Sequence, residues 1–372
     1  MSISILNPGP STTVQDLGRF GNTVWGLAHS GAMDRRAATI ANILVDNQEN
    51  AALLEYTKLG PAIRFNQNAV FAITGARSQA TLDGEPVQGY RAVRARAGQT
   101  LSIGYCQQGL YGYIAFAGGV DVPLVLGSAS THVAAHIGGF NGRALAEGDE
   151  LELKGEISDI PNLYGHFMER DNYYNFGTPG VTFIRVVPGP HEHLFDAAGV
   201  QAFYNKVFVA TGKSDRTSYY LNGQGIATKG DTSDVLSDGV AFGSIQVPSR
   251  GRPIIAMADR HTTSGVTKIG TLASVDLPLL VQRQANDLIR FRRISVYEAQ
   301  DLLRQQRAFM DKLRRGMRRP YLGEEATREP ARRIAELLTE QPVPKEGKSK
   351  MLASMFRNVD WAQATQGDLF RH

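Results

Sequence analysis

The sequence predicts a mainly β protein with two β-rich domains and a helical C-terminal extension. Its 372 residues suit two domains of ordinary size. Of its 39 glycines only four follow residue 290, so the body is rich in turns and the tail is not. Short apolar segments recur about every 8–12 residues through the body, a spacing that is typical of β-barrels or sandwiches.

In the first half, apolar and β-branched segments predict strands at 68–74, 79–82, 87–90, 100–105, 112–117 and 150–153. Asp83-Gly84 lies between two of them and predicts a hairpin, because glycine tolerates the positive φ that tight turns need. One helix is expected over 34–45, where apolar residues follow a 3.6-residue period.

The second half repeats the strand pattern after a connector over 156–180. Strands are expected at 182–187, 206–210, 240–247, 253–258 and 288–291, with a short helical stretch within 276–286. The tail is predicted to be helical from Ser295 onward. The Ser295 hydroxyl and the Glu298 carboxylate match the pattern of a capping box. Gly316 is placed to end this helix. A further helix at 330–338 and a flexible linker at 341–350 complete the expected extension.

Charge is unevenly distributed along the chain. Residues 290–372 carry 18 Lys and Arg against 11 Asp and Glu, whereas residues 1–289 carry 22 against 25. A mildly acidic body argues against a nucleic-acid groove, and the basic tail suits contact with a partner or a second copy. No apolar run reaches the length of a membrane span, and the N-terminus lacks a signal-peptide pattern. A single cysteine fits a reducing cytoplasm.

Local motifs predict no metal site and no nucleotide loop. Gly212-Lys213-Ser214 resembles the end of a P-loop, but valine occupies position 207, where the motif needs glycine. His191 and His193 are two residues apart and would need a third ligand. His132 and His136 have helical spacing, and two glycines follow closely at 138–139. A solvated loop is the simpler interpretation of the first pair, and ordinary hydrogen-bonded histidines are the simpler interpretation of the second.

Four stretches are more informative together than singly. The first is Thr-Thr-Val-Gln-Asp-Leu-Gly-Arg at 12–19, and the second is Ser-Gly-Ala-Met-Asp at 30–34, followed by Asn42 and Glu55. The third is Leu-Gly-Ser-Ala-Ser-Thr at 126–131. The fourth comprises Ser-Asp-Arg at 214–216 and the segment from Asp259 to Lys268. In order and spacing they resemble the allophanate hydrolase subunit 2 family over roughly residues 3–294.

The resemblance implies two cyclophilin-like β-barrel domains. The first would span residues 1–155 and the second 181–294, joined by the connector at 156–180. Residues 295–372 extend beyond the resemblance as the helical basic extension.

That family includes the C-type subunit of 5-oxoprolinase, the KipA antagonist and the second half of the urea carboxylase carboxyltransferase domain. By resemblance the chain is one component of an ATP-dependent lactam or amide hydrolase. ATP with Mg²⁺ would be shared with a B-type, KipI-like subunit (allophanate hydrolase subunit 1), and a lactam-hydrolysing A-type subunit is a further expected partner. One alternative is a biotin-dependent carboxyltransferase with biotin presented by another chain. The other is a non-catalytic KipA-like regulator.

Both reactions need positive charge and hydrogen-bond donors. Opening a lactam with ATP requires cations against phosphoryl charge, and carboxyl transfer requires donors aimed at a developing ureido oxygen. Lys268 is expected to be the central cation, with Arg216 as a second one. Asp259 and Asp215 would hold Mg²⁺ or orient a base.

Nine residues are expected to bind substrate: Ser30, Asp34, Asn42, Ser128, Ser130, Thr131, Arg143, Thr262 and Thr263. Structural roles stay open for several of the candidates. Ser30 and Asp34 would also suit the role of a helix cap. Asn42 would suit hydrogen bonds that hold a loop in place, and Arg216 would suit a surface ion pair with Asp215. The nearby Glu55 would also suit a pair with an arginine in a barrel wall. His261, Ser264 and Val266 depart from the family pattern, which suits the regulator alternative.

Overall fold

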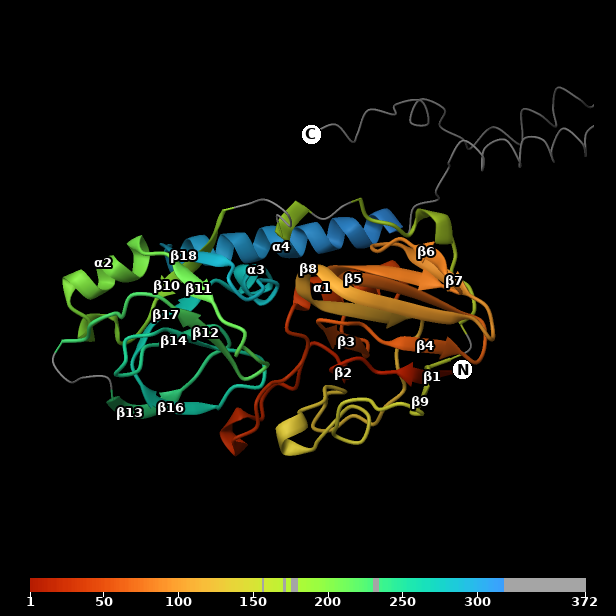
Figure 1. The fold of residues 1–372 in the computed structure, drawn as a ribbon, viewed down its shortest axis with the longest axis horizontal. Helices are drawn as coiled ribbons and strands as arrows, with labels where there is room; N and C mark the ends of the chain where they lie inside the picture. The colour runs from red at the N-terminus through yellow and green to blue at the C-terminus, as the bar shows by residue number, and fades with distance from the viewer. Residues whose placement is uncertain (156, 170–171, 175–179, 230–233, 318–372) are drawn as a thin grey trace, which may run out of the picture. The chain divides into compact units, whose positions relative to one another are not determined.

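The computed structural model describes residues 1–155, 157–169, 172–174, 180–229 and 234–317 (Figure 1). Residues 1–319 form one compact unit, and residues 320–372 form a second unit. The expected helix at 330–338 and linker at 341–350 lie outside the described residues.

The first half of the larger unit is a nine-stranded sheet, whose main path runs β2-β3-β8-β4-β1-β9. β5 joins it beside β8 and also pairs with β6 and β7. The strands are β1 (Ser2–Asn7), β2 (Thr12–Gln15), β3 (Leu53–Thr57), β4 (Ala62–Phe65), β5 (Ala69–Leu82), β6 (Glu85–Val87), β7 (Ala92–Ala95), β8 (Thr100–Phe116) and β9 (Glu150–Glu152).

Two long strands differ from the sequence-based expectation. β5 and β8 have 14 and 17 residues, where two shorter strands were expected in each. The register of the β5–β8 pairing is irregular between Gly75 and Ala80. Bulges there let both strands continue through the polar residues that separate the apolar segments in the sequence. The Asp83-Gly84 hairpin is confirmed: Leu82 pairs with Glu85 across the turn, and both turn residues have positive φ.

One helix covers this sheet. α1 (Arg35–Leu44) packs against β5 and β8, as Figure 1 shows. Nine of its ten residues are buried, which confirms the helix expected over 34–45. The N-cap is Asp34, whose carboxylate accepts from the amide of Ala37 at 2.9 Å.

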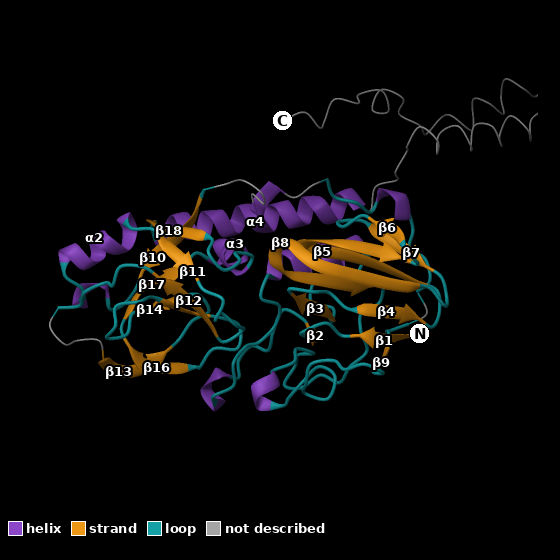
Figure 2. Ribbon diagram, in the orientation of Figure 1, coloured by secondary structure: helices purple, strands orange, loops and turns teal. Residues whose placement is uncertain are grey.

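The second half is a closed barrel in the order β10-β17-β14-β15-β12-β11-β18 (Figure 2). Its strands are β10 (Val181–Pro188), β11 (Phe208–Ala210), β12 (Ser218–Asn222), β14 (Ser244–Gln246), β15 (Ile254–Ala256), β17 (Lys268–Leu272) and β18 (Leu288–Arg293). β13 (Asp234–Gly239) and β16 (Thr263–Val266) form a separate two-stranded sheet. The fold class, mainly β with few helices, is therefore confirmed.

Further helices accompany the second half. α2 (Ala197–Asn205) was not expected from the sequence, since its buried face holds only Gly199 and Phe203. α3 (Leu277–Val281) lies within the expected stretch at 276–286. α4 (Val296–Met317) follows the barrel and packs on α1 and on the turn at Ser274–Asp276.

The capping box of α4 is confirmed. The amide of Glu298 donates to the Ser295 hydroxyl at 3.1 Å, and the amide of Ser295 donates to the Glu298 carboxylate at 2.7 Å. The described part of α4 continues through Gly316 to Met317, the last described residue. None of the described helices has a stretch long and apolar enough to cross a bilayer.

Cys106 on β8 is expected to be a poor nucleophile. Burial raises the pKa of its thiol to about 11, so little thiolate is present at pH 8. Its reaction with a maleimide should be about a hundredfold slower than that of free cysteine at pH 8, and should accelerate up to about pH 11. A rate equal to that of free cysteine would contradict the burial seen here.

Candidate functional site

The first sheet and the second barrel meet at a buried ion cluster around Arg216. Its Nε donates to Asp259 Oδ2 at 2.8 Å and its Nη2 to the carbonyl oxygen of Gly31 at 2.8 Å. Its Nη1 donates to Glu55 Oε1. Glu55 lies on β3 of the first sheet, whereas Arg216 and Asp259 come from loops of the second barrel. The expected pair of Glu55 with an arginine is therefore confirmed, and it links the first sheet to the second barrel.

This cluster continues through Tyr113 to the cap of α1. Tyr113 Oη donates to Glu55 Oε2 at 2.8 Å and accepts from the amide of Asp34 at 2.7 Å. Asp34 Oδ2 then accepts from Gln282 Nε2 at 2.9 Å and from Tyr174 Oη at 2.7 Å. Asp34 thus serves as the helix cap and as a link to residues of the second half.

Burial governs the protonation of this cluster. It raises the pKa of Glu55, and the charge of Arg216 opposes that rise. Burial also raises the pKa of Asp34, against hydrogen bonds from Gln282, Ala37 and Tyr174. Burial by itself would lower the pKa of Arg216, but the carboxylates of Asp259 and Glu55 raise it above the usual range. Arg216 is therefore a structural cation whose charge is already compensated.

A second buried network surrounds Asp16, just after β2. Its carboxylate accepts from the Ser128 hydroxyl at 2.7 Å, the amide of Ala129 at 2.7 Å, the amide of Gly18 at 2.7 Å and the Ser130 hydroxyl. Ser128 and Ser130 were expected to bind substrate, and the structure places both on this carboxylate. Asp16 itself was not among the candidates, although it lies inside the Thr-Thr-Val-Gln-Asp-Leu-Gly-Arg motif.

Three largely buried arginines lie near the contact between the first sheet and the second barrel, and we call Arg19, Arg35 and Arg260 the arginine cluster. Arg260 donates to the carbonyl of Val240 at 2.8 Å, and its Nη2 lies 3.3 Å from His29 Nδ1. Arg19 donates to the carbonyl of Ser130, and its Nη1 is buried without a hydrogen-bond partner among the described residues. None of the three forms an ion pair with another described residue.

Nearby carboxylates compensate the positive charge of the arginine cluster only in part. Burial, and then the charge of Arg35, lowers the pKa of Arg260 to about 10. Burial, Arg260 and Arg35 together lower the pKa of His29. Burial lowers the pKa of Arg19 and of Arg35, although Asp16 opposes both shifts. The sequence analysis did not include Arg19, Arg35 or His29 among the candidate site residues. Two adjacent arginines at 35–36, at the start of a helix, were a signal that could have drawn attention to this region.

Lys268 lies in a different environment, at the start of β17. It is 3% exposed, and its Nζ pairs with Asp238 on β13. Its amide donates to His191 Nδ1 at 3.1 Å. The described contacts of Lys268 do not include Asp259 or Arg216, so the structure does not bring the expected catalytic residues into one contact group. The role of Lys268 stays a prediction.

The remaining candidates make mostly local contacts. Asp215 accepts from the amides of Thr217 and Ser218 in a turn, so it does not form the surface pair with Arg216. Asn42 ties down a loop by donating to the carbonyls of Glu49 and Ala51.

Thr131 donates to the carbonyl of Val14 at 2.8 Å, and Arg143 pairs with Asp149 at 2.7 Å. Thr262 accepts through its carbonyl from Val240, and the exposed Thr263 begins β16. Ser30 is fully buried with positive φ, and its hydroxyl has no partner among the described residues. In the described part of the chain no group of three or more His, Cys, Asp or Glu side chains is arranged to hold a metal ion.

The chain matches a known protein family and two of its named relatives. Residues 25–293 match the model of the carboxyltransferase domain, subdomain A and B. The chain is 35% identical over 319 residues to the C-type subunit of 5-oxoprolinase from Haemophilus influenzae, covering 84% of this chain and 98% of that protein. It is 36% identical over 311 residues to the Escherichia coli protein of the same name, covering 84% and 97%.

Solved structures show the same fold. The urea carboxylase of Kluyveromyces lactis superposes with a TM-score of 0.77 at 26% identity, over 87% of this chain. The urea amidolyase of K. lactis gives 0.76 at 27% identity, over 84% of this chain. The chain corresponds to only 30% and 20% of these two proteins, so it represents one part of each.

Proposed function

This chain belongs to the family of carboxyltransferase domains with subdomains A and B, and on that premise we propose that it is the C-type subunit of a 5-oxoprolinase complex. The observation that carries the proposal is the share of each relative's length that the alignment covers. The alignment takes in 98% and 97% of the two 5-oxoprolinase relatives, but only 30% of the K. lactis urea carboxylase. The alignment therefore takes in nearly the whole of each 5-oxoprolinase relative, and only a part of the urea carboxylase.

In the proposed reaction the complex opens a lactam in the cytoplasm with the help of ATP. Activating a lactam oxygen by phosphorylation needs cations that neutralise phosphoryl charge and hold the substrate in line. The arginine cluster fits this need, because buried guanidinium groups without carboxylate partners favour an anion. ATP and Mg²⁺ would be shared with a B-type, KipI-like subunit, and an A-type subunit would complete the hydrolysis.

Two other functions are alternatives. The likeness to urea carboxylase favours a biotin-dependent carboxyltransferase, in which another chain presents the biotin and buried donors stabilise the ureido oxygen. A KipA-like regulator is favoured by Ser264 and Val266, which depart from the family pattern on β16. The first alternative predicts biotin dependence, and the second predicts binding of a partner without turnover.

A coupled assay separates these functions. The purified chain, reconstituted with its B-type and A-type partners, is given ATP with 5-oxoproline, with urea or without substrate. ATP hydrolysis that depends on 5-oxoproline supports the proposal. Turnover of urea that requires a biotinylated protein supports the carboxyltransferase, and a stable complex without turnover supports the regulator. Either of these results would reject the proposed function.

Lys268 gives a residue-level prediction for the reconstituted complex. Lys268→Ala should lower turnover at least about tenfold, because loss of charge stabilisation in a transition state costs a few kcal/mol. Lys213→Ala removes an exposed lysine and is the matched control. Asp238→Asn removes the ion-pair partner of the Lys268 ammonium. This variant tests whether Lys268 serves only to hold β13 in place through that pair. Unchanged kcat in Lys268→Ala would remove it from the site.

A further inference from the structure

Five side chains near the arginine cluster contact one another in a closed ring, which we call the contact ring: His29, Phe20, Arg35, Phe242 and Arg260. The ring centres of His29 and Phe20 lie 5.0 Å apart. The guanidinium carbon of Arg35 lies 5.3 Å from the ring centre of Phe20 and 5.4 Å from that of Phe242. Arg260 lies 5.8 Å from the same Phe242 ring, and its Nη2 is 3.3 Å from His29 Nδ1. Two cations and an imidazole are thus held together in a ring that has no acidic member.

Arg260 determines which nitrogen of His29 carries the proton. A guanidinium has only donors, so Nδ1 of His29 accepts the hydrogen bond from Arg260. A neutral imidazole that accepts at Nδ1 carries its proton on Nε2. Burial, and then the charges of Arg260 and Arg35, lowers the pKa of His29, which favours the neutral form. His29 therefore presents an uncharged N–H donor at Nε2.

This donor is accessible from outside the chain. His29 is half-buried, and its Nε2 has no hydrogen-bond partner among the described residues. Unlike Nη1 of Arg19, Nε2 of His29 is not a buried atom. The neighbouring Phe20 side chain is 58% exposed. An acceptor that approaches over this surface can therefore reach the Nε2–H group.

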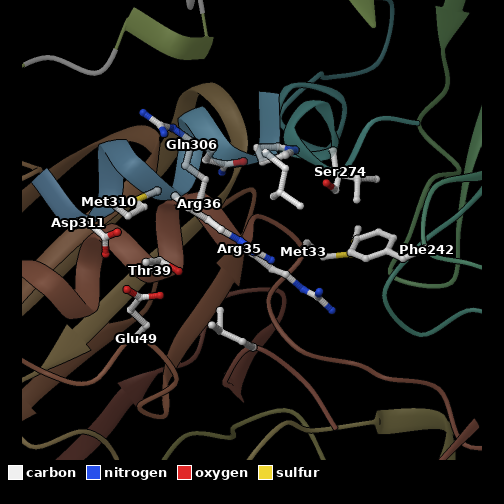
Figure 3. A pocket seen from close by; sticks show the side chains of 15 residues that line it. Met33, Arg35, Arg36, Thr39, Glu49, Phe242, Ser274, Gln306, Met310 and Asp311 are labelled. Carbon is white, nitrogen blue, oxygen red and sulfur yellow. The ribbon is translucent and has the colours of Figure 1, made fainter. Parts of the chain in front are cut away.

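Another part of the contact ring borders a pocket of about 510 Å³, which Arg35 and Phe242 help to line. Figure 3 shows Arg35 extending from α1 toward the side where Met33 and Phe242 lie. His29, Phe20 and Arg260 do not line this pocket. The accessible donor therefore lies outside the pocket, at the surface of the chain.

The charges around His29 favour an anionic acceptor. Asp16 compensates the charge of Arg35 only in part, and Asp259 compensates that of Arg260 only in part. A cation that donates to one nitrogen of an imidazole also polarises the ring and strengthens the donor on the other nitrogen. Neutral histidines whose pKa is held low act in this way toward substrate oxygens in enzymes. The Nε2–H group is thus suited to an oxygen that carries negative charge.

We propose that Nε2 of His29 donates a hydrogen bond to an anionic oxygen of the substrate, and that Arg260 is the residue that positions the imidazole. The inference rests on the proposed function, in which ATP is shared with a B-type subunit. A site that two subunits share reaches the surface of each, as this donor does. ATP carries phosphoryl oxygens and 5-oxoproline carries a carboxylate, so both supply the same kind of acceptor.

The first test observes the proton of His29 in the full chain by NMR. Selective ¹⁵N labelling of the 8 histidines and long-range ¹H–¹⁵N spectra distinguish the two neutral forms of imidazole from imidazolium, and the signals that are absent from His29→Asn assign His29. At pH 7.5 we expect the proton on Nε2. ATP or 5-oxoproline should shift the Nε2 signal, whereas 2-pyrrolidinone, a lactam without a carboxylate, should not. A proton on Nδ1, an imidazolium, an equal response to 2-pyrrolidinone, or no response to either anion would overturn the proposal.

The second test measures the affinity of the full chain for the same probes by calorimetry. His29→Asn keeps an acceptor oxygen for Arg260 but lacks the distal donor, so it should bind ATP or 5-oxoproline at least about tenfold more weakly. The affected probe identifies the oxygen as phosphoryl or carboxylate. His29→Gln extends an amide N–H further and should bind that probe more tightly than His29→Asn. His193→Gln changes an exposed histidine and is the matched control.

Unchanged affinity in His29→Asn, or an equal loss in His29→Asn and His29→Gln, would also overturn the proposal. The melting temperature of His29→Asn should stay close to that of the wild type, because Arg260 keeps its acceptor. If His29→Asn is unstable, the response of the wild-type Nε2 signal to the probes decides.

Failure of the proposed function has a different signature. A complex that does not hydrolyse ATP with 5-oxoproline, but in which the Nε2 signal of His29 still responds to an anion, refutes the function and leaves the donor site intact. A complex that turns over 5-oxoproline with the same kcat and the same KM for both substrates in wild type and His29→Asn refutes the site and leaves the function intact.

Discussion

Arg216→Met is expected to lower the free energy of unfolding by about 3–5 kcal/mol, because removing one partner of a buried ion cluster leaves uncompensated charge behind. The variant would strand the carboxylates of Glu55 and Asp259, whose side chains are 3% and 8% exposed. It would also remove a direct hydrogen-bonded link between the first sheet and the second barrel. Urea unfolding of the full chain at pH 7.5 measures the loss.

The loss should shrink as the pH is lowered. Without Arg216 the pKa of Glu55, already raised by burial, rises further. A carboxyl whose folded-state pKa exceeds its unfolded value destabilises the fold above the folded pKa, and this penalty is relieved as pH falls through it. Adding Glu55→Gln to Arg216→Met should recover part of the stability at pH 7.5. A deficit below about 1 kcal/mol that is independent of pH would contradict the buried cluster.

Local signals in the sequence sufficed for much of the fold. The Asp83-Gly84 turn, the helix at 35–44 and the Ser295–Glu298 box are encoded by neighbouring residues, so periodicity and turn chemistry predict them. The long strands β5 and β8 were divided in the prediction because bulges depend on the partner strand. α2 was missed because a helix with two buried residues leaves little periodic pattern.

The candidate site was less predictable, since its residues meet only through tertiary structure. Motif resemblance selected Arg216, Asp259 and Asp34, which the structure places in one connected cluster. It could not show that Arg216 is neutralised by two carboxylates, whereas Arg35 pairs with no described carboxylate. The contact between Arg216 and Glu55 joins residues that are far apart in the sequence. No local sequence pattern predicts a pairing at that separation. Unsatisfied groups such as Nη1 of Arg19 become visible only when the neighbours are placed.

Asp16→Ala is expected to destabilise the protein by at least about 3 kcal/mol. The substitution removes the acceptor for the amides of Gly18 and Ala129 and for the hydroxyls of Ser128 and Ser130. Each buried donor left without a partner costs about 1–3 kcal/mol, although the costs are not additive because small shifts admit water. Asp16 also places a negative charge near Arg19 and Arg35, so its removal should leave the positive charge of the arginine cluster less compensated.

The control for this prediction is Asp301→Ala on the exposed face of α4. Its pair with Arg304 is solvent-exposed, and such pairs contribute less than about 1 kcal/mol. Asp16→Asn is the sharper variant, because it keeps the volume of the side chain and turns one acceptor oxygen into a donor that faces other donors. We expect Asp16→Asn to lose at least half as much stability as Asp16→Ala, measured by urea unfolding of the full chain. If Asp16→Asn and Asp301→Ala proved equally mild, the carboxylate would not be what holds the Ser128–Ser130 loop against β2.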